Sequence, residues 1–308
     1  MIKRNDAIVT RNLTKCFGRT MAARNLSLNI VGGQCTALIG HNGAGKTTLI
    51  RMLLGLIEPT RGSSHVLGHD SQGLPSEIRT RIGYLAEGHF LWPWMRVRDA
   101  VAFQKGTFPR WDQTLFDSIL SYFGVSSNAR VRQISRGQRA AVSLGLTLAT
   151  DPEVLILDDP SMGLDPVARR ALVEAFLSFA RRDGRTILIS THQLDDVERL
   201  ADRIALISNG SLLVDAELDD FRSRVKGWIV DDPVRPAAEI PRFVDARVLD
   251  GRTHIVVADP DVESEQAIQR LGSHCEEESL SFEEAVLAYL RPSSSVGSIA
   301  NAISGGRS

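Results

Sequence analysis

The chain has 308 residues, of which 43 % are hydrophobic and 24 % charged, so it is predicted to form about two globular domains, and a largely disordered chain is excluded. Lys and Arg number 36 against 37 Asp and Glu, without the basic excess typical of nucleic-acid binders, and the distant cysteines Cys16, Cys35 and Cys275 indicate neither a disulfide framework nor a zinc cluster. With no apolar run of about 18 residues and no secretory signal at its start, the sequence predicts a soluble, reduced, intracellular protein.

Strand and helix patterns alternate through the first two thirds of the chain. Apolar residues that alternate with polar neighbours up to Gly32-Gly33 predict one half-buried strand through Leu26, Leu28 and Ile30. Residues 36–39 predict a short apolar strand that leads into a glycine-rich stretch. A helix is expected next, with one apolar face made of Leu49, Met52, Leu53 and Leu56.

Further elements continue this alternation. The pattern predicts a helix at 112–123, a buried strand at 154–157, a helix at 166–181, a strand at 186–190 and a short helix after it. A strand at 204–207 meets Asn209-Gly210, a strong hairpin signal, before residues 212–214 return. Strands alternating with helices indicate an α/β fold with a mainly parallel sheet covered on both faces, and the hairpin adds an antiparallel β piece.

A second, smaller region is expected from about Gly227. It contains a predicted hairpin between 243 and 257, a helix near 262–271 and a last helix opened by the capping-box spacing of Ser281 and Glu284. From Pro292 the chain is rich in Ser, Gly and Ala, which predicts a mobile tail. The expected division is therefore 1–218, a small α+β domain at 227–291 and a tail at 292–308.

The strongest chemical signal is the run Gly40, His41, Asn42, Gly43, Ala44, Gly45, Lys46, Thr47, followed by Thr48. It fits the phosphate-loop pattern, with the preceding strand and following helix that this motif requires. Its glycines let backbone N–H groups wrap phosphates, and the helix N-terminus favours anions. Lys46 is expected to reach the β- and γ-phosphates and the Thr47 hydroxyl to hold Mg²⁺. The alternative is a chance glycine turn.

Asp158 ends the buried strand that begins at Val154. In phosphate-loop enzymes an acid at this place holds Mg²⁺ beside the loop's hydroxyl. Many parallel strands end in Asp, so the signal depends on its combination with the phosphate loop. Together they predict a Mg²⁺-nucleotide site.

Between these two motifs, Ile134 to Gln138 is similar to the Leu-Ser-Gly-Gly-Gln signature of ATP-binding cassette (ABC) ATPases. Residues 162–165 (Met-Gly-Leu-Asp) resemble the loop that follows the Mg²⁺ strand in that family, and residues 190–192 (Ser-Thr-His) resemble its switch-histidine segment. The resemblance covers roughly residues 5–215 and rests on motifs in the family's order. It implies a P-loop NTPase cassette with a helical signature subdomain in 1–218, plus a small C-terminal α+β accessory domain like that of some bacterial exporter ATPases.

This resemblance implies a mechanism and partners. Two cassettes, a second copy or a paralogue, dimerise head to tail, and each ATP lies between one subunit's phosphate loop and the partner's signature, here Ser135, Arg136, Gly137 and Gln138. ATP and Mg²⁺ are the expected cofactors, and Mg²⁺-dependent hydrolysis is expected to drive an exporter through a separate transmembrane permease. The chain is then peripheral on the inner face of the cell membrane, and no nucleic-acid partner is expected.

Three catalytic or metal-site residues are assigned through the same resemblance. His192 is the switch histidine. Asp159 stands where the family has the glutamate that polarises water, and it is shorter by one methylene, about 1.5 Å of reach; this favours either slow hydrolysis or a shifted loop in which Asp159 serves normally. Glu87 stands in place of a glutamine that meets Mg²⁺ or the attacking water, the alternative being a solvated loop acid.

Two further positions are open. Phe17 lies where the family places an aromatic residue that stacks on adenine, and the alternative is a core residue at a strand end. Arg136 replaces the first glycine of the signature, and its cation either approaches the partner's phosphates or points into solvent.

Residues 90–95 (Phe-Leu-Trp-Pro-Trp-Met) hold two of the four tryptophans. The proline between Trp92 and Trp94 prevents a regular helix or central strand. Two interpretations stand: a packed loop that covers the core, or an aromatic lining for a short helix of the membrane subunit, since interfaces are enriched in Trp and Met.

Two rival functions stay open. One is a soluble ABC ATPase that acts on nucleic acid or ribosomes, against which stand the single cassette and the neutral charge. The other is an ATP-binding regulatory subunit with weak hydrolysis, a role that Asp159 makes plausible.

Overall fold

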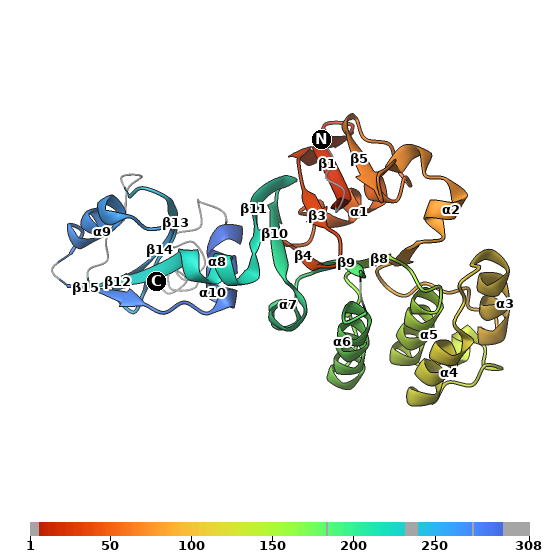
Figure 1. The fold of residues 1–308 in the computed structure, drawn as a ribbon. Coiled ribbons are helices and arrows are strands. Elements are labelled where there is room, and N and C mark those ends of the chain that lie inside the picture. The colour runs from red at the N-terminus through yellow and green to blue at the C-terminus, as the bar shows by residue number, and fades with distance from the viewer. Residues whose placement is uncertain (1–5, 183, 232–239, 273, 292–308) are drawn as a thin grey trace, which may run out of the picture. The chain divides into compact units, whose positions relative to one another are not determined.

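The computed structural model describes residues 6–182, 184–231, 240–272 and 274–291. The chain divides into two compact units, Met1–Asp215 and Ala216–Ser308. Each unit has its own sheets and helices, which are labelled in Figure 1. The tail from residue 292, which the sequence predicts to be mobile, lies outside the described residues.

A six-stranded, mainly parallel sheet forms the centre of the first unit. Its strand order is β11-β10-β4-β9-β8-β7, and the pairs from β10 to β7 are parallel. The strands are β4 (Cys35–Ile39), β7 (Ile82–Leu85), β8 (Val154–Asp158), β9 (Thr186–Thr191), β10 (Arg203–Ser208) and β11 (Ser211–Glu217). Every residue of β4, β8 and β9 is buried, as in parallel sheets covered on both faces. The predicted hairpin is confirmed, because Asn209 and Gly210, both at positive φ, join β10 to β11.

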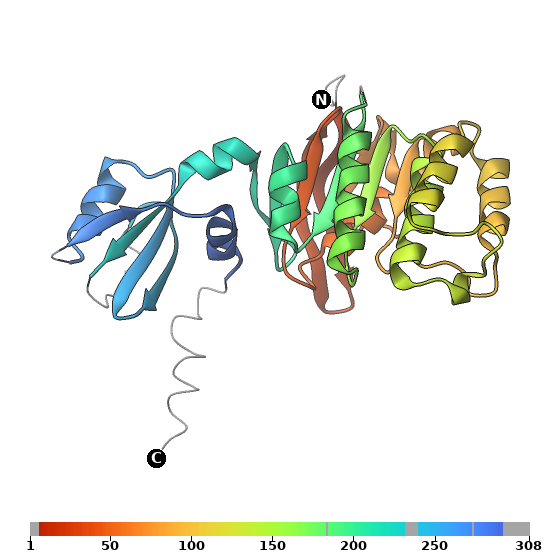
Figure 2. The same ribbon diagram turned by 90° about the horizontal axis from the view of Figure 1, so that it is seen from below.

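Helices pack against this sheet and against each other. They are α1 (Lys46–Leu53), α2 (Ser76–Arg79), α3 (Val97–Thr107), α4 (Gln113–Tyr122), α5 (Arg136–Leu148), α6 (Pro166–Ala180) and α7 (Leu194–Leu200), with 3-10 turns η1 (Ser71–Gly73) and η2 (Val131–Gln133). Both α3 and α4 contact α5, and the three lie side by side in both views (Figure 1, Figure 2). They form the helical subdomain that the resemblance implies. α3 is not among the helices predicted from the sequence, and its only buried residues are Val97 and Ala100.

A second, antiparallel sheet of five strands completes the first unit. It comprises β1 (Asp6–Phe17), β2 (Thr20–Leu26), β3 (Asn29–Val31), β5 (Arg61–Val66) and β6 (His69–Asp70). The prediction of one strand through Leu26, Leu28 and Ile30 is wrong, because the strand is interrupted between the end of β2 at Leu26 and the start of β3 at Asn29. At the interruption the buried hydroxyl of Thr10 takes up two backbone groups: Oγ1 donates to Leu26 O at 3.0 Å and accepts from Leu28 N at 2.8 Å.

The first helix is shorter than its apolar pattern predicts. α1 ends at Leu53, and Gly55 follows at φ +67°, a left-handed turn in which an added Cβ would lie 2.1 Å from Ser71 O. Leu56 therefore lies beyond the helix with 59 % of its surface exposed, and its assignment to the buried face is wrong.

The second unit is a small α+β fold. Its four-stranded sheet has the order β13-β14-β12-β15, and its elements are α8 (Leu218–Arg224), β12 (Val225–Val230), β13 (Phe243–Leu249), β14 (Arg252–Ala258), α9 (Val262–Gln269), β15 (Cys275–Glu278) and α10 (Phe282–Leu290). α8 and the first two residues of β12 precede residue 227, near which the sequence predicts the second region to begin. The capping box of Ser281 and Glu284 opens α10 as predicted. In the part of the chain that the structure describes, no helix is long and apolar enough to cross a membrane.

Candidate functional site

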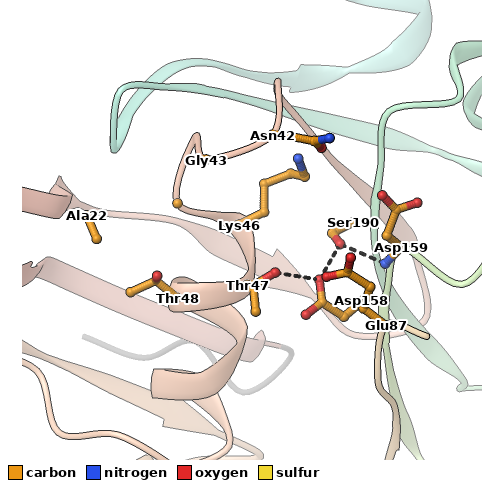
Figure 3. A pocket seen from close by; sticks show the side chains of 11 residues that line it. Ala22, Asn42, Gly43, Lys46, Thr47, Thr48, Glu87, Asp158, Asp159 and Ser190 are labelled. Carbon is orange, nitrogen blue, oxygen red and sulfur yellow. Dashed lines mark hydrogen bonds between the residues drawn. The ribbon is translucent and has the colours of Figure 1, made fainter. Parts of the chain in front are cut away.

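A pocket lies at the carboxyl edge of the central sheet, where the segments after β4, β7, β8 and β9 meet (Figure 3). Loops at this edge of parallel sheets are where such folds bind ligands. Its lining residues are Ala22, Asn42, Gly43, Gly45, Lys46, Thr47, Thr48, Glu87, Asp158, Asp159 and Ser190. The pocket therefore brings together the predicted phosphate loop, the predicted Mg²⁺ acid, the strand-end acid beside it and Glu87.

The loop between β4 and α1 has the backbone of a phosphate cradle. Gly43 and Gly45 are at φ +83° and +107°, and a Cβ on Gly45 would lie 2.3 Å from Ala22 O. Only glycine fits there, because the left-handed region and the close backbone both exclude a side chain. Gly45 is also the N-cap of α1 and makes no side-chain cap bond. The helix N-terminus thus presents backbone donors and a favourable dipole for an anion.

Lys46 supplies a positive charge inside the loop. Its Nζ donates to Gly40 O at 2.6 Å and His41 O at 3.2 Å, and 7 % of the residue is exposed. Burial lowers the Lys46 pKa, whereas the negative charges of Asp159, Asp158 and Glu87 oppose that shift. The ammonium group is therefore held by two carbonyl oxygens and lies near three acidic side chains. This arrangement suits a phosphate group that binds together with a cation.

Asp158 is buried, with 1 % of its surface exposed. Its Oδ1 accepts hydrogen bonds from Thr47 Oγ1 at 3.1 Å and Ser190 Oγ at 2.7 Å, and its Oδ2 has no hydrogen-bond partner among the described residues. A buried carboxylate oxygen without a donor needs a cation or water. Hydroxyl and carboxylate oxygens are the donors Mg²⁺ prefers, and it is usually bound by one or two carboxylates plus substrate phosphates. The residues fit Mg²⁺ of that kind, while the described residues contain no cluster of three or more His, Cys, Asp or Glu that could hold a metal without phosphate.

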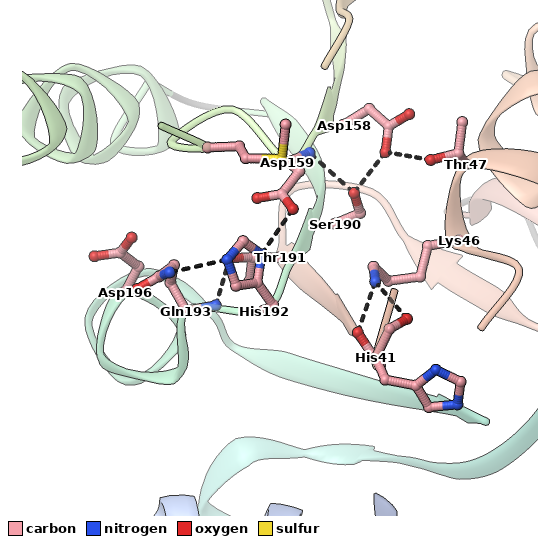
Figure 4. Close-up of polar contacts among 12 residues, drawn as sticks. His41, Lys46, Thr47, Asp158, Asp159, Ser190, Thr191, His192, Gln193 and Asp196 are labelled. Carbon is pink, nitrogen blue, oxygen red and sulfur yellow. Dashed lines mark hydrogen bonds and ion pairs between the residues drawn. The ribbon is translucent and has the colours of Figure 1, made fainter. Parts of the chain in front are cut away.

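Asp159 follows in the left-handed region, at φ +44°, and its side chain turns to His192 rather than to Thr47 (Figure 4). Its Oδ2 lies 2.7 Å from His192 Nδ1, and its Oδ1 has no partner among the described residues. His192 Nε2 lies 3.0 Å from the side-chain Nε2 of Gln193. Because that amide nitrogen can only donate, His192 Nε2 accepts and its Nδ1 carries the proton that is donated to Asp159. The acid and the histidine thus form an oriented pair beside the pocket.

Ser190 is a site residue that sequence analysis missed. Its fully buried Oγ donates to Asp158 Oδ1, and both its Oγ and its carbonyl accept from the Asp159 N–H, at 3.0 and 3.1 Å. The contact follows from the strand register, because β8 and β9 are parallel neighbours in which Asp158 pairs with Ser190. Nothing in the local sequence of either strand gives that register, so the contact needed the fold.

The signature residues lie outside this pocket. Ser135 is the N-cap of α5; its Oγ accepts from Gln138 N at 3.1 Å, and Gln138 Oε1 accepts from Ser135 N at 3.1 Å. Arg136 is exposed, and within the chain its Nη2 donates to Met162 O at 3.4 Å and its guanidinium covers Gly163, where an added Cβ would lie 2.2 Å from Cζ. Its approach to a partner's phosphates stays a prediction. The substitution in the signature therefore contacts the chain's own 161–165 loop.

Phe17 also lies outside the residues that line the pocket. At the end of β1 its ring is 52 % exposed, and Lys15 Nζ lies 5.2 Å from its centroid. The alternative of a core residue at a strand end is wrong. Stacking on adenine stays a prediction, for which this exposed face is available.

Of the predicted loop residues, Gly40, His41 and Ala44 contribute backbone: Gly40 packs against Ile207 O, His41 O accepts from Lys46, and Ala44 is buried.

A glycine-rich loop between a parallel strand and a helix, facing acids at the ends of neighbouring strands, defines a P-loop nucleotide-binding protein. A family model described as ABC transporter matches residues 23–162. The Nod factor export ATP-binding protein I of Burkholderia lata is 32 % identical over 265 residues, covering 82 % of this chain and 86 % of that protein. The chain belongs to the ABC transporter family, as its motifs predicted.

Two other comparisons define how far the likeness extends. The human phospholipid-transporting ATPase ABCA7 is 37 % identical over 215 residues, covering 68 % of this chain, and the chain spans 10 % of that relative's length. A dimeric post-hydrolysis structure of the ATP-binding cassette MJ0796 bound to ADP and Pi superposes with a TM-score of 0.60 at 22 % identity, covering 68 % of this chain and 98 % of that one. At that identity the match shows the fold alone, and it confirms the predicted P-loop cassette.

Proposed function

We propose that the chain is the ATP-binding and ATP-hydrolysing subunit of an ABC transporter, that it uses Mg²⁺, and that it drives export through a separate permease. One observation carries the ATPase part: a phosphate cradle with Lys46 faces Asp158 and Asp159, each with a carboxylate oxygen that has no partner among the described residues. The transport part rests on the family, and the direction of export rests on the relative whose name includes Nod factor export.

The chain's own residues divide the work. Backbone N–H groups of residues 43–47 and Lys46 bind the phosphates, and Thr47, Asp158 and Glu87 would hold Mg²⁺. Mg²⁺ held there would supply positive charge to offset the negative charge that develops during phosphoryl transfer. Asp159 accepts a proton from, or orients, the attacking water through its free Oδ1, while His192 fixes Oδ2. The shorter side chain of Asp159 already contacts His192 at 2.7 Å, which favours full hydrolysis over the weakly hydrolysing regulatory alternative.

The signature's position favours a two-subunit site. Ser135 and Gly137 lie at the N-terminus of α5, where backbone donors and the helix dipole suit a γ-phosphate, yet neither lines the chain's own pocket. A head-to-tail dimer, with a second copy or a paralogue, would bring this N-terminus to the partner's ATP. We therefore place Ser135, Arg136, Gly137 and Gln138 as the contribution in trans.

The loop after Glu87 presents aromatic side chains for a permease. Phe90, Trp92 and Trp94 are 69, 55 and 68 % exposed, and their rings follow one another at centroid distances of 5.3 and 6.5 Å. A loop that served only to cover the core would bury these rings. An exposed aromatic row of this kind favours docking of a short helix from the membrane subunit, which would hold the chain on the inner face of the membrane.

The ATPase proposal is tested by phosphate release from the purified chain at saturating ATP. Lys46→Ala is expected to lower turnover about 10²–10³-fold, the usual effect of losing one preorganised charge partner of the transition state. Lys105→Ala, on exposed α3, is the matched control and should match wild type. Chelation of Mg²⁺ by EDTA should abolish the turnover of wild type and of Lys105→Ala. Equal turnover of Lys46→Ala and wild type would refute the proposal.

The permease proposal is tested by co-purification of the tagged chain with a membrane protein. Trp92→Ala combined with Trp94→Ala should abolish that co-purification and leave ATP binding intact. Tyr122→Ala, a 70 % exposed aromatic on α4, is the control. Retention of the membrane partner by the double variant would exclude this loop as the docking site.

A further inference from the structure

His89 is a buried histidine that the proposed chemistry does not use. It lies in the loop that follows β7, two residues after Glu87, and 2 % of its surface is exposed. Phe90, the next residue, is 69 % exposed. The loop therefore turns one side chain fully inward directly before its exposed aromatic row.

The inward turn is made by the backbone. Gly88 and His89 have φ of +80° and +51°, two consecutive left-handed residues. A left-handed conformation is unfavourable for a residue with a Cβ, and such residues are held in place only where surrounding contacts determine them. The contact that holds His89 is therefore the feature to explain.

The ring of His89 is tied to the segment that carries the strand-end acids. Its Nε2 lies 2.8 Å from Pro160 O, and its Nδ1 has no hydrogen-bond partner among the described residues. A carbonyl oxygen can only accept, so Nε2 carries the proton and donates. Burial lowers the His89 pKa, which agrees with a neutral ring of this tautomer.

This hydrogen bond completes the fixation of Asp159. On the N-terminal side, the Asp159 N–H is held by Ser190. On the C-terminal side, the carbonyl of the next residue, Pro160, is held by His89. The left-handed backbone of Asp159, at φ +44°, is therefore held from both ends, and its side chain contacts His192 and lines the pocket.

We propose that His89 is a positioning residue for ATP hydrolysis: by donating to Pro160 O it holds the backbone of Asp159 and so aims its carboxylate at the pocket. The inference rests on the proposed ATPase function and adds a role for a residue outside the motifs. If the ring only filled space, a phenylalanine would serve at this position and would bury no nitrogen without a hydrogen-bond partner. The unpartnered Nδ1 is tolerated here because Nε2 makes the contact.

The test compares His89→Phe, which keeps an aromatic ring without the donor, with His89→Gln, whose amide keeps a donor at similar reach. Turnover, KM for ATP and the denaturation midpoint are measured for each full-length variant. We expect His89→Phe to lower kcat about 10- to 100-fold, the cost of a misplacement near 1 Å, with KM nearly unchanged. His89→Gln should restore most of kcat. If His89→Phe does not fold, His89→Asn, whose amide is too short to reach Pro160, takes its place.

A second arm asks whether His89 acts through Asp159. In an Asp159→Asn background, His89→Phe should cause no further loss, because the group it positions is gone. The inference is overturned if the two losses multiply, if His89→Gln is as slow as His89→Phe, or if His89→Phe changes KM and not kcat. Normal turnover of His89→Phe overturns this inference alone, whereas absence of turnover in the wild type overturns the proposed function and this role with it.

Discussion

The pair formed by Asp159 and His192 allows the sharpest prediction, for the nearly isosteric change Asp159→Asn. The Asp159 side chain is 8 % exposed, and its Oδ2 accepts a hydrogen bond from His192 Nδ1 at 2.7 Å. Hydrogen bonds to charged groups contribute about 1.5–3 kcal/mol, and each 1.4 kcal/mol or so corresponds to about tenfold in rate. Loss of a positioned base lowers the rate by about 10²–10⁴-fold. We expect kcat to fall within that larger range, with ATP binding retained because Lys46 and Thr47 are unchanged.

The assay is phosphate release at saturating Mg²⁺ and ATP, with ATP binding measured separately. Asp117→Asn is the matched control, since Asp117 is an exposed carboxylate on α4 that accepts from Gln113 Nε2 at 2.8 Å. The control should turn over like wild type. Unchanged kcat in Asp159→Asn would refute the assignment of Asp159 to the chemistry.

The reverse change, Asp159→Glu, gives the same reasoning a stricter test. Glutamate is the family's usual residue here, but one more methylene adds about 1.5 Å, and His192 already lies 2.7 Å from the aspartate. The longer side chain must displace His192 or turn its carboxylate away. A misplacement near 1 Å costs on the order of 10²-fold, so Asp159→Glu should be slower than wild type, and a faster variant would show that this backbone leaves room for the family residue.

Two further predictions concern stability. Gly163→Ala should lower the free energy of unfolding by about 1–2 kcal/mol, because Gly163 is at φ +69°. The control Gly73→Ala, where an added Cβ meets open space, should lower it by less in the same urea titration. Equal losses would exclude backbone strain as the cause. Glu153→Gln should destabilise at pH 7, because the hydrogen bond from Arg81, followed by its charge and that of Arg110, lowers the Glu153 pKa. Since the folded pKa is depressed, this stabilisation is present above the unfolded pKa of about 4.3 and is lost as pH falls through the folded pKa. The wild-type and Glu153→Gln unfolding curves should therefore converge at low pH, and a difference that persists there would contradict the ion pair.

Contiguous motifs carried most of what the sequence could predict. The phosphate loop is read directly, because its glycines, Lys46 and Thr47 are neighbours in the chain and the strand and helix around it have clear apolar periods. Asp158 is read as the end of a buried strand. Each prediction starts from a contiguous stretch of sequence, and that of Asp158 gains its meaning from the phosphate loop; Lys46, Thr47 and Asp158 all line the pocket.

Contacts between distant segments could not be predicted in this way. The hydroxyl of Thr10, at the interruption between β2 and β3, bonds to residues 16 and 18 positions away. Arg136 replaces a glycine, and only the fold shows that its guanidinium covers Gly163. The inward turn of His89 depends on a contact with Pro160, 71 positions along the chain. In each case the decisive partner comes from an element that folds back, and the sequence near the residue contains no trace of it.

Ser190 connects the two acids of the site through one hydroxyl group. A single hydroxyl on β9 donates to the acid that faces Thr47 and accepts from the backbone of the acid that faces His192. Because His192 follows only two residues later on the same segment, any displacement of the end of β9 reaches both acids and the histidine together. The groups that would hold the cation and the pair formed by Asp159 and His192 are therefore coupled through one hydroxyl and one strand end.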